Sequence, residues 1–362
     1  MKERNTTLDL AKGILIILVV LGHAIQYSGN GNWEDSQLFF DDIVFRAIYS
    51  FHMPLFMMIS GYLFYSSNKK DFKPLMISKL RAIGIPLLVF TLLMNVVWYI
   101  PLLINGKVLE IFSQYLGTLV FKMNMWFLLS LLLNMVAVAV ITRVFKRIRA
   151  QYIGMCILFM ISFFIPDGLI LAVHKFMFPF FCIGYVLNQN QIPLFTYSQR
   201  TICLVILTVL SLGAIWWFDK ETSIYTTGFC ILKDFKGQLQ IDFKRMIIAL
   251  IVSYTFMQYV SRLSRYNTFI AHQTIRLGGM TLFIYGMNMV FNFYTRFLVD
   301  RLSLHYEPSY LRAIFVTILF LFVCHYLYQI LNQNVTTQVV ARQCTAPCMK
   351  ACGSAILGVW PR

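Results

Sequence analysis

Residues 8–27 read LDLAKGILIILVVLGHAIQY, and this stretch decides the fold class. A helix needs about 20 mainly apolar residues to cross the hydrocarbon core of a bilayer. The stretch has that length, carries Lys12 and His23, and lacks the small-residue cleavage site of a secretory signal peptide. We therefore expect it to be the first membrane-spanning helix.

The composition extends this expectation to the whole chain. Of its 362 residues, 59% are hydrophobic and 13% are charged, against about half and about a quarter in soluble domains, which excludes a soluble enzyme. The net charge of +16 fits the lysines and arginines that membrane proteins collect in cytoplasmic loops, so no nucleic-acid partner is predicted. The cysteines show no zinc spacing and no disulfide framework, and no metal is predicted.

Nine further apolar runs follow the first, so the sequence predicts an all-α, polytopic integral membrane protein with about ten transmembrane helices in the lipid bilayer. The expected helices are 8–27, 43–65, 83–104, 124–142, 152–166, 172–188, 201–218, 243–260, 280–298 and 311–331. Basic residues favour a cytoplasmic N-terminus and C-terminus, and the expected outer loop 30–42 has four acidic residues and no lysine or arginine. Residues 1–332 are predicted to form the transmembrane domain and 333–362 a cytoplasmic tail without an assigned role.

Two ionisable residues of the first helix share one face. Lys12 and His23 are eleven positions apart, which places them within about 20° of each other around the helix and about 16 Å apart along it. Lys12 suits a phosphate near the cytoplasmic end, and His23 suits proton transfer at near-neutral pH. The alternatives are an interfacial anchor for Lys12 and a structural hydrogen bond for His23.

The second helix, SFHMPLFMMISGYLF, carries another histidine at membrane depth. Pro54 removes a backbone donor and is expected to open the helix locally near His52. Ser60 and Gly61 offer a small-residue face for close helix packing. A packing histidine beside a kink is the alternative for His52.

Four further residues are candidates with weaker signals. Lys79 and Arg81 precede the third helix and suit phosphates, although basic residues are common there in any case. Trp126 is a candidate cofactor contact, with an interfacial tryptophan as the usual alternative. Asn288 in the ninth helix, LGGMTLFIYGMN, carries an amide that needs a partner or a substrate at this depth.

Six motifs together resemble a known family. Arg4 with LDLAKGILIILVVLGH, then FHMPLFMMISGYLF, KLRAIGIP, WFLLSLL, FPFFCIGYVL and LGGMTLFIY occur in the order found in membrane acyltransferase family 3, especially its fucose O-acetylase-like branch. The resemblance covers about residues 4–331. Thr281 stands where the family often has serine, and Asn288 takes a late polar position where the family often has histidine.

The resemblance implies transfer of an acyl group, usually acetyl from cytoplasmic acetyl-CoA, to a hydroxyl of a carbohydrate or other surface molecule. The family's basic-x10-histidine motif falls on Lys12 and His23, and its basic pair falls on Lys79 and Arg81, which implies contacts with the CoA phosphates. His52 and Trp126 match further family motifs. The resemblance also implies that the chain is a multi-pass protein of a bacterial plasma membrane.

The mechanism remains open between two routes at this point. In the first route, His23 acts as a general base on the acceptor hydroxyl in a ternary complex, with His52 or Asn288 stabilising the oxyanion. In the second route, His23 itself attacks the thioester to form an acetyl-imidazole. Two rival functions are a polysaccharide or small-molecule exporter on the same scaffold and a membrane sensor without chemistry.

Overall fold

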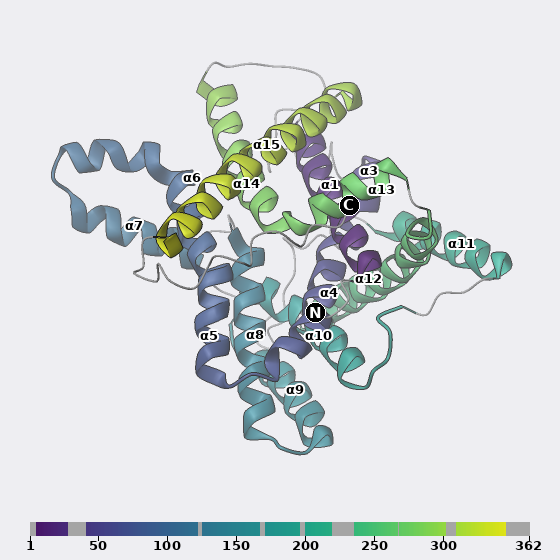
Figure 1. Ribbon diagram of the computed structural model, residues 1–362. Coiled ribbons are helices and arrows are strands. Elements are labelled where there is room, and N and C mark those ends of the chain that lie inside the picture. The colour runs from purple at the N-terminus through teal and green to yellow at the C-terminus, as the bar shows by residue number, and fades with distance from the viewer. Residues whose placement is uncertain are drawn as a thin grey trace.

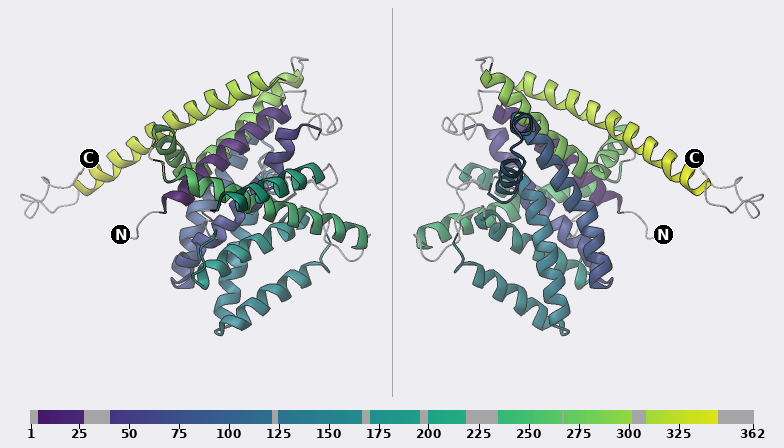
Figure 2. Two further views of the ribbon diagram at one scale, coloured as in Figure 1. Left: turned by 90° about the vertical axis from the view of Figure 1, so that its right-hand side faces the viewer. Right: turned by 90° about the vertical axis from the view of Figure 1, so that its left-hand side faces the viewer.

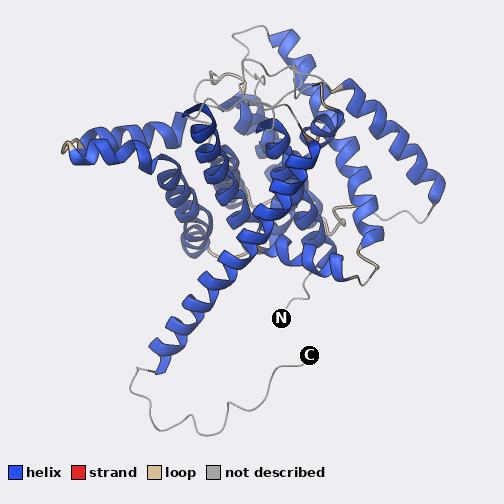
Figure 3. Ribbon diagram, turned by 90° about the horizontal axis from the view of Figure 1, so that it is seen from above, coloured by secondary structure: helices blue, strands red, loops and turns tan. Residues whose placement is uncertain are grey.

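The protein is described by a computed structural model over residues 5–27, 41–121, 125–166, 171–195, 200–218, 235–266, 268–301 and 309–344. Every regular element in these ranges is a helix, which Figure 3 shows in blue. The elements are α1 (Thr6–Tyr27), α3 (Ile43–Tyr49), α4 (His52–Asn68), α5 (Phe72–Lys79), the π-helix η2 (Leu80–Gly84), α6 (Ile85–Ile104), α7 (Val108–Phe121), α8 (Trp126–Val144), α9 (Ile148–Ser162), α10 (Leu171–Gln189), α11 (Thr201–Trp217), α12 (Phe235–Leu263), α13 (Phe269–Gly279), α14 (Thr281–Arg301) and α15 (Tyr310–Cys344).

The all-helical membrane fold predicted from the apolar runs is confirmed, because each of the ten runs is a helix or a helix pair here. Seven stretches of the described residues are long and apolar enough to cross a membrane, namely Thr6–Tyr27, Ile43–Asn68, Phe72–Ile104, Trp126–Val144, Leu171–Gln189, Leu239–Leu263 and Tyr310–Asn332. The runs at 152–166 and 201–218 form the shorter apolar helices α9 and α11, and the run at 280–298 forms α14. Helix α15 continues to Cys344, past the boundary expected at residue 332.

Helix α1 lies in the middle of the molecule and contacts α3, α4, α12, α13, α14 and α15 (Figure 1). Two pairs of helices approach so closely that only glycine fits between them. A Cβ on Gly13 would lie 1.9 Å from the carbonyl oxygen of Thr274 in α13, and one on Gly61 would lie 2.0 Å from that of Phe181 in α10. The close packing expected at Gly61 is therefore present, and it fixes α4 against α10.

Three helices were not expected from the sequence, namely α5, α7 and α13. Helix α13 packs on α1, and α7 returns along α6, so that the α6–α7 pair projects from one side of the body (Figures 1 and 3). The end of α15 projects beyond the other helices as well (Figure 2).

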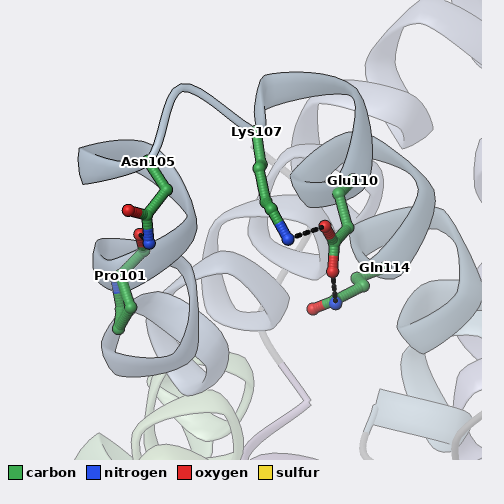
Figure 4. A network of polar contacts seen from close by, with 5 residues as sticks. All are labelled: Pro101, Asn105, Lys107, Glu110 and Gln114. Carbon is green, nitrogen blue, oxygen red and sulfur yellow. Dashed lines mark hydrogen bonds and ion pairs between the residues drawn. The ribbon is translucent and has the colours of Figure 1, made fainter.

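The turn between α6 and α7 is fixed by local polar contacts (Figure 4). Gly106 adopts φ +69°, a left-handed conformation that favours glycine. The Asn105 side chain donates to the carbonyl oxygen of Pro101 at 2.8 Å, and Lys107 pairs with Glu110 at 3.3 Å in the first turn of α7. Glu110 lies in the first turn of α7, where its negative charge interacts favourably with the positive end of the helix dipole. The contacts of this turn therefore stabilise both the end of α6 and the start of α7.

The π-helix η2 contains one of the predicted site residues, Arg81. Pro86 lacks a backbone N–H and cannot donate to the carbonyl of Ala82, which disturbs the regular ladder at this point. The Arg81 side chain is exposed on this segment.

Candidate active site

His23 and His52 line one cavity of about 540 Å3, called here the histidine cavity. His23 comes from the C-terminal part of α1 and His52 from the first residue of α4, so the cavity lies near the end of α1 that is far from Lys12. Side chains of α6, α8, α10, α12 and α14 complete its walls. The structure thus brings together two histidines that the sequence placed on separate helices.

A break between α3 and α4 positions His52. Helix α3 ends at Tyr49, the chain leaves helical geometry at Phe51 (φ −143°), and α4 begins at His52. Pro54 lies in the first turn of α4, where its missing N–H has no helical partner in any case. The His52 Nδ1 lies 2.6 Å from the carbonyl oxygen of Ile48. The opening expected near His52 is therefore present, and its ring binds one of the carbonyl groups beside it.

His23 is oriented by an asparagine of α14. Its Nδ1 lies 2.7 Å from Oδ1 of Asn288, and the Asn292 side-chain amide donates to the same oxygen at 3.1 Å. An amide oxygen can only accept, so Nδ1 of His23 carries the proton and Nε2 keeps its lone pair. Asn288 is buried and lies behind His23, whereas Asn292 lines the cavity.

Tyr49 connects the two histidines. Its ring lies edge-on to both, with centroids 6.5 Å from His23 and 4.9 Å from His52. Its hydroxyl donates to Oε1 of buried Gln26 at 3.1 Å. Sequence reasoning missed both residues, although Gln26 and Tyr49 are each three positions from a histidine, a spacing that shares a helix face.

Glycine makes room for this tyrosine. A Cβ on Gly22 would lie 2.8 Å from Cε2 of Tyr49. Gly22 therefore allows the ring of Tyr49 to lie against α1 beside His23.

Trp126, predicted as a cofactor contact, lies in the same cavity. It is the first residue of α8, is buried, and lines the cavity together with Trp98 of α6. Indole rings at this position provide flat apolar surface with one donor each. Trp126 therefore lies with His23 and His52 and not with the predicted lysines.

Lys12, Lys79 and Arg81 are not among the described residues that line the histidine cavity. Lys12 forms an ion pair with Asp9 at 2.7 Å near the N-terminal end of α1. Lys79 lies 3.4 Å from Oγ of Ser67 near the C-terminal end of α4. His23 lies near the C-terminal end of α1, and His52 lies at the N-terminal end of α4. Lys12 and Lys79 lie near the opposite ends of these two helices, so they are on the other side of the bundle from the histidines.

That other end holds a second, polar cavity of about 350 Å3 lined by Lys69, Lys70 and Arg143. The Arg143 guanidinium donates to Oδ1 of Asn68 at 2.8 Å and to the carbonyl oxygen of Lys70 at 2.7 Å. Arg143 thus ties the end of α8 to the end of α4. Lys69, Lys70 and Arg143 therefore lie at the opposite end of the structure from the two histidines.

Two arginines of the histidine cavity were also missed. Arg245 of α12 is only 3% exposed, lies 3.2 Å above the ring centroid of Phe176, and is 3.8 Å from Asp242. Arg296 of α14 is half-buried. From the sequence both counted only as charges of outer segments.

Comparisons with known proteins show the family of this chain. A family model described as an acyltransferase domain matches residues 5–329. The chain is 28% identical over 300 residues to nodulation protein NolL of Mesorhizobium japonicum, covering 78% of this chain and 75% of the relative. It is 33% identical over 198 residues to nodulation protein NolL of Sinorhizobium fredii, covering 52% of this chain and 50% of that relative. No solved structure matches. Because the family model covers nearly the whole chain, the protein belongs to membrane acyltransferase family 3.

Proposed function

We propose that this membrane acyltransferase moves an acetyl group from cytoplasmic acetyl-CoA to a hydroxyl of a carbohydrate or other cell-surface molecule, with His23 as the general base. The observation that carries the proposal is the contact between His23 and Asn288. It leaves Nε2 of His23, in a cavity of about 540 Å3, able to accept a proton.

The two ends of the molecule suit the two substrates. With the N-terminus in the cytoplasm, the end that holds Lys12, Lys79 and Arg81 faces the cytoplasm and would bind the phosphates of CoA. Lys12 and His23 are about 16 Å apart along α1, a span that the extended pantetheine arm would bridge. The acceptor would enter the histidine cavity from the outer side of a bacterial plasma membrane.

In the proposed step, Nε2 of His23 removes the proton of the acceptor hydroxyl as its oxygen attacks the thioester carbon. The carbon–sulfur bond then breaks, and the imidazolium returns its proton to the leaving thiolate of CoA. Holding both substrates in one cavity removes much of the entropic barrier to this attack.

The geometry supports different roles for the two further candidates. The Asn288 amide lies behind His23 and binds Nδ1, so we assign it to positioning and not to the oxyanion. In neutral His52 the proton on Nδ1 is donated to Ile48, and Nε2 can only accept. We therefore assign His52 a contact with an acceptor hydroxyl. Trp126 would pack against the acyl end of the donor or a sugar ring.

The test is acetyl-CoA turnover by the protein purified in detergent, with release of free CoA as the readout. His23→Ala should lower the rate about 10² to 10⁴-fold while acetyl-CoA binding and folding persist. His272→Ala, which removes an exposed histidine of α13, is the matched control and should keep full activity. Unchanged turnover in His23→Ala would contradict the role of His23, and failure of the wild type to bind acetyl-CoA would contradict the donor.

A second measurement separates the two chemical routes. Incubation with acetyl-CoA and no acceptor, followed by mass spectrometry of the peptide that contains His23, should show no added acetyl group if transfer is direct. An acetylated His23 that disappears when acceptor is added would establish the covalent route instead.

A further inference from the structure

We infer that the polar cavity, the cavity of about 350 Å3 lined by Lys69, Lys70 and Arg143, binds the 3′-phosphoadenosine end of the acyl-CoA donor. The inference rests on the proposed function and deepens it, because it concerns the donor of that reaction. It adds a site for the nucleotide to the phosphate contacts proposed for Lys79 and Arg81.

The charge of the polar cavity is the first argument. Its lining includes three basic residues, Lys69, Lys70 and Arg143, and one acidic residue, Asp71. Within the described residues, none of these four forms an ion pair. The Arg143 guanidinium donates to the Asn68 amide oxygen and to backbone carbonyl oxygens, which are neutral acceptors. The cavity therefore has an excess of positive charge, which attracts a multiply charged anion such as a phosphate.

The walls of the polar cavity suit a nucleotide better than a phosphate alone. Tyr65 and Phe72 line it, with Nζ of Lys69 lying 4.7 Å from the ring centroid of Tyr65 and Cζ of Arg143 lying 5.1 Å from that of Phe72. Aromatic rings beside cationic groups provide a stacking surface for a base next to the groups that bind its phosphates. The volume also falls within the range of small-molecule sites.

An unpartnered acceptor lies in the same wall. The Gln189 side chain donates to Oε1 of Gln151 at 2.8 Å, but its own Oε1 is buried and has no hydrogen-bond partner among the described residues. A buried acceptor without a donor is costly. The 6-amino group of adenine would supply the missing donor.

The polar cavity also lies at the right distance from the histidine cavity. Both are lined by α4, α8 and α10. On α8, Trp126 lines the histidine cavity and Arg143 the polar cavity, which places the two about 25 Å apart along the helix axis. At about 1.2 Å of extended chain per bond, the sulfur of CoA lies about 16 Å from the nearer pyrophosphate phosphorus and about 25 Å from the 3′-phosphorus. The longer distance fits the polar cavity, and the shorter one matches the span from His23 to Lys12.

Lys70 connects the polar cavity to the contacts already proposed for the donor. It lies close enough to Lys79 for the two charges to interact, and Lys79 lies 3.4 Å from Oγ of Ser67 on the same end of α4. A ligand with several phosphates, as CoA is, can therefore bind at Lys79 and at Lys70 together.

Equilibrium binding of CoA and of dephospho-CoA, which lacks the 3′-phosphate, to the protein purified in a neutral detergent tests the inference. We expect CoA to bind about tenfold or more tightly, since hydrogen bonds to charged groups contribute this much. Lys70→Gln should remove most of this preference and leave binding of dephospho-CoA nearly unchanged, and Lys69→Gln should act in the same direction. Both positions are exposed, so the variants should fold. Lys73→Gln, which changes an exposed lysine of α5 outside the described lining of the cavity, is the matched control and should keep the preference.

Two results would overturn the inference. One is equal binding of CoA and dephospho-CoA by the wild type. The other is a preference for CoA that persists in both Lys69→Gln and Lys70→Gln, because the polar cavity would then serve another anion, such as the phosphate of a lipid headgroup.

Acetyl-CoA turnover is measured on the same preparations. Equal binding of the two probes by an enzyme whose turnover depends on His23 would count only against the polar cavity as the nucleotide site. Failure of the wild type to bind either probe, together with absence of turnover, would count against the proposed donor itself. The two failures are therefore distinguishable.

Discussion

Nδ1 of His23 lies 2.7 Å from the amide oxygen of Asn288, although 265 positions of the chain separate the two residues. This contact joins α1 to α14 and selects the tautomer of His23 in which Nε2 can accept a proton. The contact therefore supports the role as general base that we propose for His23.

Asn288→Leu should therefore lower kcat without raising the KM for acetyl-CoA. Loss of one hydrogen bond to a buried group costs about 1–3 kcal/mol, or roughly tenfold to a hundredfold in rate. Steady-state kinetics checks this expectation. Asn288→Asp keeps an acceptor oxygen at Nδ1 and should restore most of the rate, whereas equal loss in both variants would show that Asn288 acts only through packing.

Tyr49→Phe should lower the thermal stability of the protein. The change removes the hydroxyl that donates to Oε1 of buried Gln26 at 3.1 Å, at a cost of about 1 kcal/mol or more. Thermal unfolding in detergent measures the effect. Tyr266→Phe is the control, because Tyr266 is 65% exposed, and an equal loss there would argue against the Tyr49–Gln26 contact.

Gly184→Ala should destabilise the fold strongly, because the added Cβ would lie 1.9 Å from the carbonyl oxygen of Met58 in α4. Helices α4 and α10 would have to separate, at a cost of about 1–3 kcal/mol or more. A lower midpoint of thermal unfolding and lower yield of folded protein are the expected results. Gly213→Ala in α11 meets nothing within 4 Å and should be neutral or stabilising; similar losses at both glycines would contradict the packing described.

Lys79→Ala should raise the KM for acetyl-CoA and leave kcat nearly unchanged, because the phosphate contact that we propose for Lys79 lies far from the reacting atoms and would stabilise substrate and transition state equally. The effect should shrink at high salt, which screens exposed charges. Kinetics at two ionic strengths measures both. Lys107→Ala, in the α6–α7 turn, serves as the control, and an unchanged KM in Lys79→Ala would remove Lys79 from the donor site.

The fold class could be predicted from the sequence because a bilayer imposes a simple requirement. Each crossing segment needs about 20 apolar residues with its backbone hydrogen bonds satisfied internally, and seven stretches of the described residues meet this requirement. Helices α7 and α13 were not predicted because their sequences carry Glu110 and Arg276 and are too short in apolar residues to span a bilayer. Asn105-Gly106 is nevertheless a turn signal that indicates the start of α7.

For the candidate site too, part could be predicted from the sequence and part could not. The sequence by itself singled out His23, His52, Trp126 and Asn288 as candidates, because each is a polar or indole group in an apolar helix. Only the tertiary structure decided that the first three share a cavity, that Asn288 binds the back of His23, and that Arg245 and Arg296 join them. Helical periodicity determines which face a residue occupies on its own helix. The packing of eight helices around one cavity depends instead on glycine contacts and on the break between α3 and α4, which involve residues far apart in the chain.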